Sequence, residues 1–184
     1  MILGILGDIR GCVSGLQAVL RRLRGVDTLI SLGDVGRQSR EAEECRRILQ
    51  QAGAIRLKGE DDPDEDLPLT FAGPDLLCAH SNPQRPARPL AIAGRYDADF
   101  QMRYFQQSIF VCGHPARLRV FAKCRGRLSR LLPVPRSGVL RLHPTRRYLV
   151  SLGSVCPADG FHHWVEVDTG LRLVRFRTML ARGT

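Results

Sequence analysis

The chain of 184 residues lacks the sequence features of membrane-spanning and disulfide-bonded proteins. No apolar stretch approaches the roughly 18 residues that a membrane-spanning helix requires. Its 6 cysteines are scattered without a C-x-x-C pair, so we expect thiols packed among apolar side chains and no zinc–cysteine site. The apolar segment 1–6 lacks the basic n-region of a signal peptide and runs directly into Asp8. We therefore expect a buried strand there and a cytoplasmic protein.

Lysine is also scarce, because only Lys58 and Lys123 among the 28 basic residues are lysines. A GC-rich genome would favour this use of arginine. A net charge of +10 would equally favour anionic ligands, and arginine suits phosphate. The basic residues are densest from Arg117 to Arg147, where aromatic rings are few. We expect a solvated face there and rank nucleic-acid binding last among the functions considered.

The pattern of apolar runs predicts an α/β fold in one domain spanning residues 1–184. A hydrophobic content of 43% is enough for one substantial core. Ser14 is expected to cap the first helix, which ends at Gly25. Further helices are expected at 39–52 and 97–107, and strands at 2–6, 26–32, 54–57, 67–71, 75–79, 108–112, 118–121, 139–142, 148–152, 164–167 and 171–176.

Acidic residues and histidines follow several of these strands in a fixed order. We expect five of them to lie on one rim of one sheet: Asp8, Asp34, Glu60, His80 and His114. Carboxylates and imidazoles gathered in this way suit a divalent transition metal, and such metals hold phosphoryl oxygens and activate water. The motifs that carry these residues are Gly7-Asp8-Ile9-Arg10-Gly11, Gly33-Asp34-Val35-Gly36, Gly59-Glu60-Asp61-Asp62, Cys78-Ala79-His80-Ser81, Gly113-His114-Pro115 and Gly153-Ser154-Val155.

With these motifs the chain resembles the calcineurin-like metallophosphoesterases, in particular their small bacterial and archaeal branch. Those proteins carry the patterns D-x-H-G-N, G-D-x-x-G, G-N-H-D, H-G-x-P, G-H-T-H and N-P-G-S-V-x-x-P. The resemblance covers residues 2–177 and implies a four-layer α/β/β/α sandwich with two metal ions at the strand ends. It makes Asp8 the first aspartate and Asp34 the bridging one. It also implies a second metal position formed by Asp34 with Glu60, His80 and His114, where Glu60 replaces an asparagine.

Three departures from the family patterns weaken the resemblance at the site. Arg10 stands where a histidine ligand of the first metal belongs, and Asp61 replaces the histidine thought to protonate the leaving group. Ala116 replaces the last histidine of G-H-T-H. We therefore expect one divalent ion (Mn, Zn, Fe or Ni) at the second position, or none.

Several residues near the motifs admit two readings. Arg10 can hold a phosphate oxygen or pair with Asp8, and Arg37 can contact phosphate or face solvent. Asp61 can serve as a general acid if its pKa is raised. Ser154 is a candidate for substrate binding. For the pair His162-His163 we expect a place on the surface or on an edge strand.

The leading functional hypothesis is a weak metal-dependent phosphoester hydrolase with an impaired, mononuclear site. Its partner would be a phosphorylated small molecule or a nucleotide, such as a phosphodiester. We expect no interaction with a membrane. The competing hypothesis is an inactive member of the family that binds phosphate, a nucleotide or another protein. The oligomeric state is left open.

Overall fold

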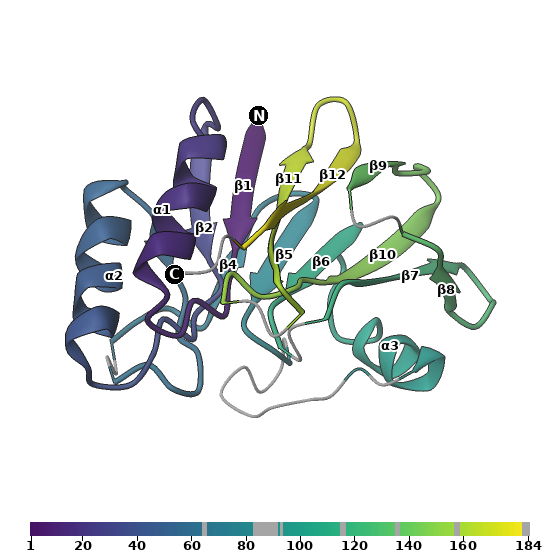
Figure 1. Cartoon of the computed structure of the whole chain (residues 1–184). Helices are drawn as coiled ribbons and strands as arrows, with labels where there is room; N and C mark the ends of the chain where they lie inside the picture. Colours follow the sequence, from purple (N-terminus) through teal and green to yellow (C-terminus); the bar gives the residue numbers. More distant parts are fainter. Residues whose placement is uncertain are drawn as a thin grey trace.

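Two mixed sheets face each other in the computed structural model, which describes residues 1–63, 66–82, 92, 94–114, 117–134, 137–156 and 159–181. Helices α1 (Val13–Arg22) and α2 (Arg40–Gln51) cover the first sheet, and α3 (Arg95–Gln101) covers the second (Figure 1). These four layers confirm the expected α/β/β/α sandwich. None of the described helices is long and apolar enough to cross a membrane.

The first sheet has the strand order β3-β2-β1-β11-β12-β9. Strands β1, β2 and β3 run parallel, and β11 is antiparallel to both of its neighbours. The carboxyl ends of the three parallel strands therefore meet at one edge. The strands are β1 (Ile2–Leu6), β2 (Thr28–Ser31), β3 (Ile55–Arg56), β9 (Gly138–Arg141), β11 (Phe161–Asp168) and β12 (Leu173–Leu180).

The second sheet has the order β4-β5-β6-β10-β7-β8. Its three central strands β5, β6 and β10 run parallel, so their carboxyl ends also share an edge. Strands β4, β7 and β8 are antiparallel to their neighbours. The strands are β4 (Thr70–Ala72), β5 (Leu76–Ala79), β6 (Ile109–Cys112), β7 (Arg119–Cys124), β8 (Arg130–Leu132) and β10 (Arg146–Ser151).

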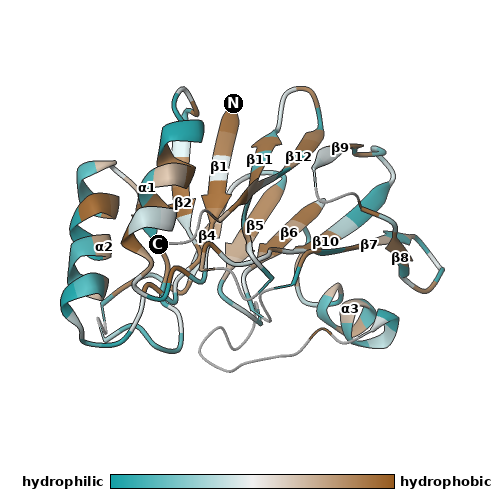
Figure 2. Cartoon of the chain, viewed as in Figure 1, coloured by the Kyte–Doolittle hydropathy of each residue, from teal (hydrophilic) through white to brown (hydrophobic). Residues whose placement is uncertain are grey.

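The core consists of three apolar layers, which follow from the alternation of side chains along the strands. Between the sheets, Ile5 and Ile30 meet Val111 and Val150. The outward-facing residues of the first sheet pack on α1 and α2, and those of the second sheet pack on α3. Strands β1, β5 and β6 are accordingly hydrophobic over most of their length, whereas hydrophilic and hydrophobic residues alternate along α1 and α2 (Figure 2).

Most of the expected elements are present, and the errors lie mainly at their ends. Ser14 does not cap the first helix, since that helix begins at Val13 and its N-cap Cys12 makes no side-chain bond. Ser39, in contrast, accepts a hydrogen bond from the amide of Ala42 and caps α2 as expected. The third helix is shorter than predicted, because it ends at Gln101. Strand β8 was not predicted.

Two further expectations were wrong. The five motif residues lie at the edges of two sheets and not on one rim of one sheet, because β5 and β6 belong to the second sheet. The pair His162-His163 is buried on β11 in the interior of the first sheet. Each of these histidines has a polar partner: His162 lies against the carbonyl of Val155, and His163 against Asp159. Pro115, Ala116 and Arg136 lie outside the described residues.

Candidate metal centre

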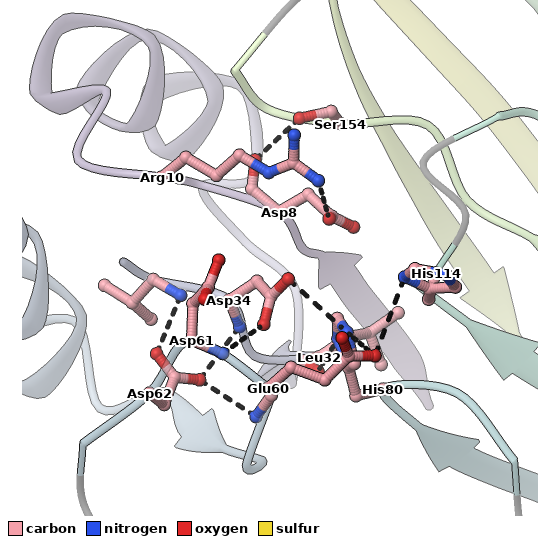
Figure 3. Close-up of polar contacts among 12 residues, drawn as sticks. Asp8, Arg10, Leu32, Asp34, Glu60, Asp61, Asp62, His80, His114 and Ser154 are labelled. Atoms are coloured by element: carbon pink, nitrogen blue, oxygen red, sulfur yellow. Dashed lines mark hydrogen bonds and ion pairs between the residues drawn. The ribbon is translucent and has the colours of Figure 1, made fainter. Parts of the chain in front are cut away.

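The candidate site lies where the carboxyl edges of the two sheets come together (Figure 3). Loops after β1, β2 and β3 supply Asp8, Asp34 and Glu60. Loops after β5 and β6 supply His80 and His114 from the other sheet. The short distance of 3.5 Å between His80 Nε2 and Asp34 Oδ2 shows how closely the two edges approach. The structure thus gathers all five residues that the motifs singled out.

Three side chains form a group with the chemistry of a metal site: Glu60, His80 and His114. One possible ligand atom of each lies within 4.8 Å of the others. Glu60 Oε1 is 3.9 Å from His80 Nε2 and 3.8 Å from His114 Nδ1. These separations are too long for direct hydrogen bonds, so the three groups face one another without bonding. Two imidazoles and a carboxylate are a donor set that Zn²⁺ and Mn²⁺ accept.

The orientation of His80 fits a metal ligand. Its Nδ1 lies 3.2 Å from the carbonyl oxygen of Leu32, and a carbonyl can only accept a hydrogen bond. The Nδ1–H group therefore donates to this carbonyl, and Nε2 points toward Asp34 and Glu60. This Nε2 is buried and has no hydrogen-bond partner among the described residues. A carbonyl that fixes the tautomer in this way is typical of histidines that bind metals.

Asp8 and Arg10 form a separate unit beside this group. Arg10 Nη2 is 3.1 Å from Asp8 Oδ1, and the carboxylate is fully buried while half of the Arg10 side chain is exposed. Asp8 Oδ2 has no partner among the described residues. Burial raises the pKa of the Asp8 carboxyl, and Asp34 acts in the same direction, whereas His80 and Arg10 oppose the rise. Arg10 therefore supplies part of the positive charge that a metal ion would otherwise give Asp8.

The backbone at these loops is held in an uncommon conformation. Asp8, Arg10 and Asp34 have φ values of +52°, +49° and +53°, in the left-handed region that favours glycine. Such values persist only where surrounding bonds impose them, and they occur often at functional sites. Here the amide of Asp8 donates to the carbonyl of Gly33, and that of Arg10 to the carbonyl of Asp34. The loops after β1 and β2 therefore hold each other in place.

Asp62 fixes the loop that carries Asp34, and sequence reasoning missed this role. Its buried carboxylate accepts hydrogen bonds from the amides of Asp34 at 2.8 Å, Val35 at 2.9 Å and Gly59 at 2.9 Å. The neighbouring loops approach so closely that a Cβ on Gly59 would overlap Asp34. The family pattern G-N-H-D ends in an aspartate at this position, and that was the available signal.

The remaining candidates lie at the margin of the site. The Asp61 carboxylate accepts a hydrogen bond of 2.9 Å from Arg37 Nε, and both side chains are exposed or half-exposed. The hydroxyl of Ser154 is buried, donates to the carbonyl of Asp8 and accepts from the amide of Cys156. Ser154 thus stabilises the Asp8 loop through these two hydrogen bonds. Proton donation by Asp61 and substrate contacts by Arg37 and Ser154 stay predictions.

Comparison with solved structures shows which known proteins share this fold. A metallophosphoesterase from Sphaerobacter thermophilus superposes with a TM-score of 0.80 at 20% identity, over 99% of this chain and 90% of that one. A novel archaeal phosphodiesterase gives 0.57 at 11% identity, over 98% and 99% of the two chains. A putative diadenosine tetraphosphatase gives 0.56 at 18% identity, over 100% and 95%. No protein-family profile and no curated protein matches the sequence.

These identities are too low to transfer an activity, but the agreement extends over nearly the full length of both chains in each case. The strand order and the place of the acidic and histidine loops come from this chain's own structure. The chain has the fold of the metallophosphoesterases.

Proposed function

We propose that the chain is a phosphoester hydrolase that uses one divalent metal ion, held by Glu60, His80 and His114 together with Asp34. The observation that carries the proposal is the convergence of these donors around the unpartnered Nε2 of His80. A bound divalent ion would supply Lewis-acid charge to a phosphoryl oxygen and acidify a water molecule. We propose further that residues 1–184 act as one domain in this role.

Arg10 is proposed to hold the substrate phosphate. Its guanidinium bonds Asp8 through Nη2 and is half exposed, so it can meet a ligand from the solvent side. Arginine presents several N–H donors in a planar fork that matches two phosphoryl oxygens at once. Asp8 orients that fork. Arg37 lies further out, where it steadies Asp61.

The proposed substrates are phosphodiesters or nucleotide phosphates, and turnover is slow. Two of the structural neighbours are described as a phosphodiesterase and a putative diadenosine tetraphosphatase, which supports this substrate class. Slow turnover follows from the residues at the margin. Asp61 stands where a proton-donating histidine is expected, and loss of a general acid costs about 10²–10⁴-fold in rate. Arg10 cannot bind a metal, because its guanidinium stays protonated.

The second candidate is a phosphate- or nucleotide-binding protein without turnover. The Arg10–Asp8 ion pair favours it, since Arg10 offsets part of the charge of the buried carboxylate without any metal. An anion could then bind to the exposed part of Arg10. In this case binding would persist when all divalent metal is removed.

Hydrolysis of bis(p-nitrophenyl) phosphate, with Mn²⁺ and with a chelator, separates the two candidates. We expect Mn²⁺ to raise the rate and His114→Ala to abolish the increase, because His114 is one of the four proposed side-chain ligands. His143→Ala is the control, since the side chain of this exposed loop histidine makes hydrogen bonds only with Thr145 among the described residues. No hydrolysis, together with phosphate binding in chelator that Arg10→Ala weakens, would favour the binding protein.

A further inference from the structure

The face of the second sheet that carries α3 combines arginines with exposed aromatic rings. Arg95 begins α3, Arg119 begins β7 and Arg130 begins β8. These three side chains come from separate elements and line one cavity of about 410 Å³. The aromatic ring of Phe121 also lines it, as does Leu131, which is 56% exposed. The cavity therefore has apolar walls and three cationic side chains.

Helix α3, whose Arg95 lines this cavity, also carries two exposed aromatic rings. Tyr96 is 65% exposed and Phe100, one turn along, is 46% exposed. The guanidinium of Arg95 stacks over the Tyr96 ring at 4.8 Å. The turn after β7 is joined to the helix, because the hydroxyl of Ser129 donates to the carbonyl of Arg95. The helix and the hairpin are therefore in direct contact.

Negative charge on this surface is already neutralised or engaged. The Asp99 carboxylate lies 2.6 Å from Lys123 Nζ and accepts a hydrogen bond from the amide of Ser129. The Asp97 carboxylate accepts from the amide of Gly94. Arg130, in contrast, is exposed and its side chain has no ion pair or hydrogen bond within the described parts of the chain. Its charge is available to a ligand.

We propose that α3 and the β7–β8 hairpin bind single-stranded nucleic acid. Proteins that bind single strands combine a basic groove for the phosphates with aromatic side chains on which unpaired bases stack. Here Arg95, Arg119 and Arg130 supply the charge, and Tyr96 and Phe100 supply the rings. The sequence between Arg117 and Arg147 shows only the first component, because the aromatic residues come from α3, earlier in the chain.

None of the residues that line this cavity belongs to the proposed metal centre. Arg119 pairs through its backbone with Ser151 at the site edge of the sheet, and Arg130 pairs with Ala122, three residues farther along β7. The cavity therefore extends away from the metal centre along the strands. Binding of single-stranded nucleic acid in this cavity would not depend on the metal ligands.

Fluorescence anisotropy of labelled oligo(dT) and oligo(U) probes of about 16 nucleotides, in chelator, tests the proposal. We expect binding whose logarithm falls with the logarithm of salt concentration with a slope of about −2, because each of three neutralised phosphates adds roughly −0.7. Arg130→Gln should reduce the slope by about 0.7. Tyr96→Leu should weaken binding about 5- to 160-fold, and Tyr96→Phe should restore it. Oligo(dT) and oligo(U) together show whether the sugar is distinguished.

Arg24→Gln is the matched control, since it removes the same charge from an exposed site between α1 and β2. It should leave the slope and affinity nearly unchanged. Equal effects of Arg24→Gln and Arg130→Gln would mean attraction by net charge alone and would overturn the proposal. Loss of binding in His114→Ala would place the probe in the metal centre, with the same consequence. Absence of binding at low salt, or binding indifferent to Tyr96→Leu, would also refute it.

Discussion

Replacement of Asp62 should destabilise the protein more than replacement of any single exposed carboxylate. The buried carboxylate accepts three backbone hydrogen bonds, two on Oδ2 and one on Oδ1. Hydrogen bonds to a charged group contribute about 1.5–3 kcal/mol each, and their loss is less than additive. Asp62→Ala should therefore lower the free energy of unfolding by about 3–6 kcal/mol. Asp62→Asn can keep both bonds of Oδ2 and should cost about 1–3 kcal/mol.

Urea denaturation followed by the fluorescence of the single tryptophan, Trp164, measures these costs, because that side chain is buried between the first sheet and its helices. Asp66→Ala is the control, since it removes an exposed carboxylate four residues farther along the chain than Asp62. It should change the free energy by less than about 0.5 kcal/mol. A cost below about 1 kcal/mol for Asp62→Ala, or equal costs for Asp62→Ala and Asp62→Asn, would refute the reasoning.

Two further predictions concern the Asp8 loop. Burial raises the pKa of Asp8 above its ordinary value of 3.8, so the folded protein binds this proton more tightly than the unfolded chain does. In chelator, stability from this group should be full below that ordinary value and should fall as the pH rises through the raised pKa. Asp8→Asn should remove this dependence of the urea midpoint on pH, and an unchanged dependence would contradict it. Ser154→Ala removes the bonds to the Asp8 carbonyl and the Cys156 amide and should cost about 1–3 kcal/mol; an unchanged free energy of unfolding would show that Ser154 does not support the loop.

The sequence predicted most of the elements and singled out the five motif residues, because both depend on local patterns. Apolar runs ending in Gly-Asp mark buried strands that deliver a carboxylate to a loop, as β1 and β2 do. It could not predict how the strands are shared between sheets. That partition depends on pairings between distant segments, such as β1 with β11. Hence the motif residues were expected on one sheet and are found on two.

Errors at single residues have the same origin. No role was predicted for Asp62 from the sequence, because its burial depends on amides from two loops, one of them 27 or 28 residues away in sequence. His162 and His163 looked like surface residues because polar side chains are mostly exposed. Their burial results from the place of β11 between β1 and β12 and from partners in the loop before it.

The central claim is one divalent ion bound by Glu60, His80 and His114 together with Asp34. Calorimetric titration of the chelator-treated protein with Zn²⁺ or Mn²⁺ tests it most directly. The account predicts one ion per chain, binding weakened at least about 10-fold in His80→Ala, and no change in His143→Ala. Two ions per chain, no ion at all, or a His80→Ala variant that binds like the wild type would contradict it.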